Sequence, residues 1–338
     1  MPLPMRRLGP FEVSALGLGC MNLSHAYGEP PPAEAAEALL LRALDLGVTL
    51  FDTAALYGFG VNESLVGRML KPHRARITLA SKCGMTGVEG KRVIDGRPAT
   101  LKRTCEEALD RLQTEVIDLY YLHRWDRQVP IEESVGALGE LVSEGKVKAI
   151  GLSEVSSATL RRAHAVHPIT AVQNEYSLWT REPEIELLEE CRRLGVAFVA
   201  FSPLGRGFLT GKLIEPAFAP KDIRLAMPRF QPEHFGRNLG LLPPYQALAS
   251  EAACTPAQLA LAWLLAKGDD IIPIPGTTCI GHLEEDLAAA TLRLEEDLVR
   301  RLDALINEKT VAGDRYNAAS RPEIDTERFS DRDPGGEP

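Results

Sequence analysis

Short apolar runs alternate with helix-like segments along most of the chain, and this alternation constrains the fold more than any other feature. The runs predicted as strands are residues 16–19, 50–52, 77–81, 116–122, 147–151, 171–174, 196–201 and 271–274. A helix-like segment follows each run, and Pro130 and Gly145 mark the start and end of one of them. Eight such units are the number that closes a (β/α)8 barrel. We therefore expect an α/β fold of the TIM-barrel type.

The remaining segments are expected to decorate this barrel. Residues 5–8 and 12–14 flank a Gly9-Pro10 turn and predict an N-terminal β-hairpin. Residues 206–242, after the seventh strand, form a long Pro- and Gly-rich loop that we interpret as a lid or cofactor cover. Residues 295–307 predict an extra C-terminal helix. The expected organisation is one domain over 1–320 and a disordered charged tail over 321–338.

Composition narrows the function classes. The net charge of −9 argues against nucleic-acid partners and against an anionic membrane surface. The six cysteines include no C-x-x-C pair, so neither a metal site nor a disulfide scaffold is indicated. The N-terminus has no apolar signal-peptide core, and no apolar run approaches the ~20 residues that span a bilayer. These features together favour a cytoplasmic protein.

Four polar residues stand at or just beyond the ends of predicted strands: Asp52, Tyr57, Lys82 and His123. Parallel strands would bring them to one rim, where α/β barrels build active sites. The ammonium of Lys82 would lower the pKa of the Tyr57 phenol, and Asp52 would keep Lys82 charged. Such a set suits protonation of a developing alkoxide. Because no side chain provides a hydride, a nicotinamide cofactor is implied.

Other interpretations of these residues stay open. A single Asp or Lys at a strand end is more often a solvated rim residue than a catalyst. Lys82 could alternatively serve as the Schiff-base nucleophile of a barrel aldolase. Because all four polar residues stand at predicted strand ends, proton chemistry is favoured over the interpretation that each is a solvated rim residue.

The runs FDTAALYG, ASKCG and DLYYLHR resemble the aldo-keto reductase family, and the resemblance extends from about Met5 to about Asn307. It implies a (β/α)8 barrel that reduces aldehydes or ketones to alcohols with NAD(P)H, with Tyr57 as general acid. Asp52, Lys82 and His123 would complete the catalytic tetrad. The most similar members are bacterial and plant reductases of aldehydes, ketones and pyridoxal. Some relatives are accessory subunits without catalytic activity, which remains an alternative.

The same resemblance assigns a cofactor site, through GLSEVS, AVQNEYSLW and AFSPLGRGFLTGKL. Ser153 and Gln173 would bond the carboxamide, and Phe201 would stack on the nicotinamide. The other residues assigned to the cofactor are Met21, Asp52, Ser202, Leu204, Gly205, Arg206, Gly276, Thr277, Thr278, His282, Glu285 and Asp286. NADPH is expected, with NADH possible, because Thr278, Cys279 and His282 replace the usual Lys or Arg at the 2′-phosphate.

Substrate contacts are expected from Tyr57 and His123 and from the aromatic side chains of Tyr27 and Trp125. The remaining histidines, His25 among them, receive no role. No spare Arg or Lys is recognised at the reacting centre, so aromatic or medium-chain aldehydes should be preferred over small carboxylated keto acids. The physiological substrate, the direction of reaction and the oligomeric state are left open.

Overall fold

The computed structural model describes residues 2–88 and 91–331. Its strands are β1 (Met5–Leu8), β2 (Phe11–Ser14), β3 (Leu18–Gly19), β4 (Leu50–Asp52), β5 (Thr78–Cys83), β6 (Met85–Val88), β7 (Lys91–Ile94), β8 (Ile117–Leu122), β9 (Val147–Ser153), β10 (Ala171–Glu175), β11 (Ala197–Phe201) and β12 (Ile271–Pro273). Its α-helices are α1 (Ala33–Asp45), α2 (Val61–Leu70), α3 (Pro98–Leu112), α4 (Ile131–Ser143), α5 (Ser157–Val166), α6 (Leu187–Leu194), α7 (Pro232–Leu239), α8 (Leu242–Glu251), α9 (Pro256–Ala266), α10 (Ile280–Ala288) and α11 (Glu296–Leu305).

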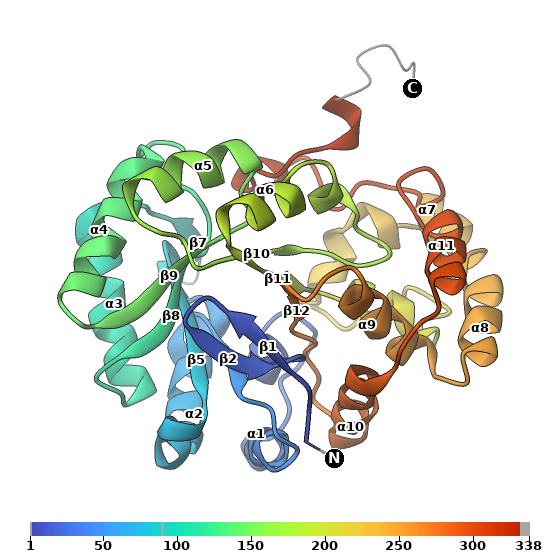
Figure 1. Ribbon diagram of the computed structural model, residues 1–338, viewed down its shortest axis with the longest axis horizontal. Coiled ribbons are helices and arrows are strands. Elements are labelled where there is room, and N and C mark those ends of the chain that lie inside the picture. The colour runs from blue at the N-terminus through green and yellow to red at the C-terminus, as the bar shows by residue number, and fades with distance from the viewer. Residues whose placement is uncertain (1, 89–90, 332–338) are drawn as a thin grey trace.

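Eight parallel strands form the barrel, in the order β3-β4-β5-β8-β9-β10-β11-β12. The first and last strands meet through backbone hydrogen bonds: Gly17 donates to Pro273 O over 3.0 Å, and Gly19 donates to Pro275 O over 3.0 Å. Helices surround the strands on the outside (Figure 1). The predicted (β/α)8 barrel is therefore confirmed.

Side chains alternate between the interior and the outer face of the barrel along each strand. Leu50 and Ala80 belong to the apolar cluster inside the barrel. Asp52 and Lys82 follow two residues later on their strands and face the same interior. Because the strands are parallel and in register, with Asp52 beside Ala80, these polar positions gather at the carboxyl end.

The N-terminal hairpin closes the opposite end of the barrel. Leu8 of β1 and Val13 of β2 are fully buried in the interior cluster, and Phe11 packs against it. Figure 1 shows the hairpin lying across the strands at the near end of the barrel. The predicted hairpin thus serves as an apolar plug, which leaves the carboxyl rim as the open side.

A second, larger apolar cluster fills the layer between the strands and the helices. Helix α9 is buried along nearly its whole length, which suits a helix that is apolar on every face. Its neighbours include α8 and α10, and α11 in turn packs on α8. The predicted extra C-terminal helix therefore forms part of the outer cover on this side.

Three segments differ from the sequence-based expectations. Strands β6 and β7 form an antiparallel hairpin that was not predicted. The long segment 206–242 contains three 3-10 helices and the helix α7. Residues 321–331, expected to be disordered, instead pack on the rim: Asp325 N donates to Glu154 O over 2.9 Å, and Arg127 pairs with Asp325 at 2.9 Å. Residues 332–338 of the expected tail lie outside the described residues.

Candidate active site

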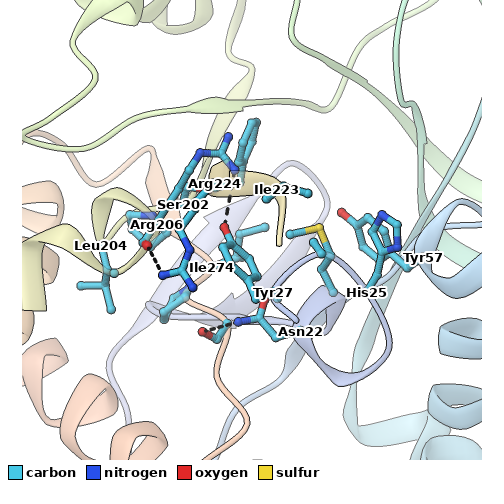
Figure 2. Close-up of a pocket in the computed structure, with 18 of the residues that line it drawn as sticks. Asn22, His25, Tyr27, Tyr57, Ser202, Leu204, Arg206, Ile223, Arg224 and Ile274 are labelled. Atoms are coloured by element: carbon cyan, nitrogen blue, oxygen red, sulfur yellow. Dashed lines mark hydrogen bonds between the residues drawn. The ribbon is translucent and has the colours of Figure 1, made fainter. Parts of the chain in front are cut away.

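A cavity of about 780 Å³ opens at the carboxyl rim of the barrel. Strand ends form its floor, and the segment after β11, the start of α10 and the C-terminal segment (residues 312–331) supply its walls. Figure 2 shows His25 beside Tyr57 in one part of the cavity, with Tyr27, Arg206 and Leu204 in another. The cavity is therefore elongated and links the tetrad to the region of α10.

The four predicted catalytic residues meet at the floor of this cavity. Lys82 is fully buried, and its Nζ donates to Asp52 Oδ1, to Thr53 O over 2.9 Å and to the Tyr57 hydroxyl over 3.1 Å. The ring of His123 meets the Tyr57 ring edge-on, with centroids 5.8 Å apart. The Tyr57 hydroxyl is thus held between an ammonium and the open cavity.

The charges of the tetrad are set by burial and by these contacts. Burial alone would lower the pKa of Lys82, but Asp52 and Tyr57 outweigh burial and the pKa is raised, so the ammonium persists. Burial raises the pKa of Tyr57, and Lys82 opposes that shift without cancelling it. Lys82 thus lowers the Tyr57 pKa as expected, but burial, which was not considered, outweighs it and the net shift is upward. Tyr57 stays protonated at neutral pH and can donate.

The two histidines beside Tyr57 are electrically neutral near pH 7. Burial lowers the pKa of His123 well below its ordinary value, and the positive charge of Arg124 adds to this shift. Burial also lowers the pKa of His25, whose ring stacks on that of Tyr57 with centroids 6.1 Å apart. The sequence assigned His25 no role, but it lines the cavity against the proposed acid (Figure 2).

The residues expected at the nicotinamide end lie together on the barrel floor. Ser153 and Phe201 end β9 and β11, Gln173 lies on β10 between them, and all three line the cavity. Gln173 Nε2 donates to Asp52 Oδ2 over 2.7 Å, which joins this group to the tetrad. A hydroxyl, an amide and an aromatic face beside Tyr57 are the groups that a carboxamide-bearing ring needs, so the donor set fits a nicotinamide.

The residues expected at the adenosine end border the other end of the cavity. Thr277, Thr278 and His282 line it, and so does Lys212, which the sequence analysis did not assign. Lys212 Nζ lies 3.6 Å from Glu285 Oε2 and is largely exposed. Burial raises the pKa of Asp286 to about 7, with Glu285 adding to the shift and Lys212 opposing it. This end therefore holds an exposed cation, Lys212, and a carboxyl, Asp286, that titrates near neutrality.

Arg206 lines the cavity, but its guanidinium is already engaged. It pairs with Glu175 Oε2 at 2.6 Å and donates to the Tyr316 hydroxyl over 3.1 Å. Its backbone φ of 57° is left-handed, as the tight turn after β11 requires. Arg206 therefore shapes the turn at the expected diphosphate site, while its charge is neutralised by Glu175 rather than by a phosphate.

A second buried ion pair joins the C-terminal segment to the same rim. Arg315 donates to both oxygens of Glu154, over 3.0 and 2.8 Å. Burial alone would raise the pKa of Glu175, but Arg206 and then Arg315 outweigh it, and the pKa is lowered. The two arginines and the two glutamates thus form a network of ion pairs that stabilises this wall of the cavity. Glu154 is thus neutralised by an arginine of the C-terminal segment (residues 312–331).

Some expected contacts are not brought to the cavity. Trp125 was expected as a substrate wall, but its indole donates to Val129 O over 2.9 Å, and Arg127 and Arg162 cover its ring. Neither Trp125 nor Gly205 is among the lining residues in the described part of the chain. Met21, Tyr27, Ser202, Leu204, Gly276 and Glu285 do line it.

A family model described as the aldo/keto reductase family matches residues 15–307. The chain belongs to the aldo/keto reductase family. As a member it is an oxidoreductase of the kind that uses a nicotinamide cofactor. The predicted family is confirmed.

Individual relatives agree with this assignment. The chain is 47% identical over 309 residues to a probable aldo-keto reductase of Glycine max, covering 90% of this chain and 89% of that protein. It superposes on the glycerol dehydrogenase of Gluconobacter oxydans with a TM-score of 0.82 at 28% identity, covering 89% and 94% of the two chains. A Klebsiella pneumoniae aldo/keto reductase in complex with NADP and acetate gives a TM-score of 0.71 at 26% identity, covering 93% and 99%.

Proposed function

We propose that this aldo/keto reductase reduces aldehydes or ketones to alcohols, with NADPH as the hydride donor and Tyr57 as the general acid. The observation that carries the proposal is the Lys82 Nζ, fully buried between the Asp52 carboxylate and the Tyr57 hydroxyl at the cavity floor. The relative from Klebsiella pneumoniae that was solved with NADP supports the choice of cofactor.

The proposed chemistry divides between cofactor and protein. A bound reduced nicotinamide would supply a hydride, that is a proton with two electrons, to the carbonyl carbon. Tyr57 gives its hydroxyl proton to the carbonyl oxygen, which becomes the alcohol, and Lys82 stabilises the phenolate that remains. Neutral His123 can donate a hydrogen bond to the same oxygen and so orient the carbonyl. Solvent that enters the cavity after the product leaves returns a proton to Tyr57.

The electrostatics of the site favour this role over the aldolase alternative. A Schiff-base lysine must lose its proton to attack a carbonyl. The pKa of Lys82 is raised, and its Nζ donates to three oxygens. Tyr57, in contrast, keeps its proton at neutral pH and borders the open cavity. The accessory-subunit alternative has no comparable support, since all four tetrad residues are present and assembled.

The location of the protein remains a proposal as well. None of the helices described here is long and apolar enough to cross a membrane. All six cysteines are free thiols, which suits the reducing cytoplasm that we propose as its compartment.

A direct assay tests the function. Purified protein is mixed with NADPH and a panel of carbonyl compounds, and loss of cofactor absorbance is followed beside the Tyr57→Phe variant. We expect turnover of reactive aldehydes by the wild type and a large loss in the variant. Cofactor binding without turnover of any aldehyde would favour the accessory role. Trapping of a substrate on Lys82 by borohydride would favour the aldolase.

A further inference from the structure

The cavity is lined by several cations, and most of them already have a carboxylate partner. Arg92 pairs with Glu323, and Arg224 pairs with Asp222 at 2.7 Å. Arg206 and Lys212 have their own partners, described above. Arg124 differs, because no carboxylate of the described residues lies within 4.0 Å of its guanidinium.

The guanidinium of Arg124 is fixed on one side and free on the other. Its Nη1 donates to His123 O over 2.8 Å and approaches Ser153 Oγ at 3.4 Å. Its Nε is buried without an acceptor. Its Nη2 has no acceptor among the residues described and, unlike Nε, is not shut off from solvent. One edge of the guanidinium therefore remains available at the cavity.

This free edge lies at the reacting end of the cavity. Arg124 directly follows His123 at the end of β8, and Ser153 is the expected carboxamide ligand at the end of β9. Burial raises the pKa of the Tyr57 phenol, and the charge of Arg124 is among the influences that oppose this rise. The expectation that no spare Arg or Lys is present at the reacting centre is therefore wrong.

A partly buried guanidinium without a counter-ion is costly, and a carboxylate relieves that cost through charge-assisted hydrogen bonds. Arginine binds carboxylates with a geometric precision that lysine lacks. Apolar walls from Leu56, Met85 and Met227 line the same cavity. The combination suits a molecule with an apolar body and one negative group.

Resting on the proposed function, we propose that Arg124 is a specificity-determining residue that selects carbonyl substrates carrying a carboxylate. The carboxylate binds the free edge of Arg124 while the carbonyl oxygen faces Tyr57 and His123. This deepens the expected preference for aromatic aldehydes: the preferred ones carry an acid group at the far end of an apolar body.

The test compares 4-carboxybenzaldehyde, which carries a carboxylate, with its neutral methyl ester, using NADPH as the hydride donor. For the wild type we expect kcat/KM to be about 10- to 100-fold higher for the acid, the range of a charge-assisted hydrogen bond. Arg124→Gln should abolish this ratio and leave the ester within about threefold, whereas Arg124→Lys should retain part of it. Arg92→Gln removes one positive charge from the same cavity and should leave the ratio intact.

Separate binding measurements distinguish the failures. The Kd for NADPH, followed by fluorescence, should change by less than about threefold in Arg124→Gln. If kcat/KM in Arg124→Gln fell equally for both aldehydes and NADPH binding weakened, Arg124 would serve the cofactor, and the proposal would be overturned. A wild-type ratio near one would also overturn it.

If the wild type binds NADPH but reduces neither aldehyde, the proposed function fails and the inference is still tested. The enzyme–NADP+ complex is then titrated calorimetrically with 4-carboxybenzyl alcohol. Weaker binding to Arg124→Gln than to the wild type upholds the carboxylate subsite, and equal binding overturns it.

Discussion

The side-chain amide of Gln173 donates a hydrogen bond to Asp52 over 2.7 Å, while the other carboxylate oxygen of Asp52 accepts from Lys82. One carboxylate thus holds both a residue expected at the cofactor and the ammonium that supports the acid. Because Asp52 is 3% exposed, water cannot replace either bond. Changes at Asp52 should therefore appear in cofactor binding as well as in the chemical step.

Asp52→Asn tests that coupling. Asp52 is the main influence that raises the pKa of Lys82 against burial, so its loss should lower that pKa. We expect reduction by the variant to fall at a lower pH than in the wild type, and the Kd for NADPH to rise. The pH dependence of kcat and fluorescence titration of NADPH measure the two effects. An unchanged pH profile would show that Asp52 does not control the Lys82 ammonium.

Tyr57→Phe removes only the hydroxyl that we propose as the acid. General acid catalysis contributes about 10²–10⁴-fold, so kcat should fall by at least that order while the Kd for NADPH stays nearly constant. Tyr27→Phe is the matched control, because Tyr27 also lines the cavity with its hydroxyl near Arg206. Near-normal kcat in Tyr57→Phe would refute the assignment.

Lys82→Met should damage both stability and the reaction. The change leaves the Asp52 carboxylate buried without its ion-pair partner, which typically costs about 3–5 kcal/mol. It also removes the influence that lowers the pKa of Tyr57, so alcohol oxidation, which needs the phenolate, should shift to higher pH. Urea unfolding and the pH profile of oxidation are the measurements. A variant as stable as the wild type would contradict the buried pair.

Asp286→Asn should stabilise the protein in a pH-dependent way. The folded-state pKa of about 7 exceeds the unfolded value, so the contribution of Asp286 to stability is full below about pH 4 and is lost as pH rises towards 7. The asparagine side chain does not ionise, so the variant does not lose this stability as pH rises. At pH 8 we expect it to be more stable by about 1–4 kcal/mol, as each pKa unit corresponds to about 1.4 kcal/mol.

Thermal unfolding at pH 8 and pH 4.5 measures this difference, which should be much smaller at the lower pH. The exposed Glu308→Gln is the control and should show no such trend. A gain in stability that is equal at both pH values would mean that Asp286 does not titrate between them.

Cofactor preference should depend on Lys212 and His282, which both line the adenosine end. Lys212→Met should weaken NADPH more than NADH, because only NADPH carries the 2′-phosphate. His282→Arg should tighten NADPH, since a guanidinium bonds phosphate bidentately. The Kd values for both cofactors in each variant measure this. If the ratio of the two Kd values is the same in both variants as in the wild type, the 2′-phosphate must bind elsewhere.

The barrel and the tetrad could be predicted because both depend on local periodicity. Alternation along a strand fixes which residues face the interior, and parallel strands bring equivalent ends together. Thus Lys82 and Asp52 meet although 30 residues separate them. Ser153 and Gln173, which were assigned through the family resemblance, also line the cavity floor.

The predictions failed for residues whose positions depend on contacts with distant parts of the chain. Trp125 was expected at the cavity, but a hydrogen bond to Val129 O directs its indole elsewhere. His25 follows a 3-10 helix, Met21–Leu23, whose position only packing determines. The charged tail from residue 321 suggested disorder, yet Asp325 finds a partner on the rim. For Arg124, adjacency to His123 was the only available signal, and no sequence period gives the direction of a loop side chain.

The plug formed by β1 and β2 has a consequence for the order of events in turnover. With one end of the barrel filled by Leu8 and Val13, every ligand must pass through the same mouth. A nicotinamide bound at Phe201 and a carbonyl bound at Tyr57 would therefore share one entrance. We therefore expect the two ligands to enter and leave the barrel one after the other rather than independently.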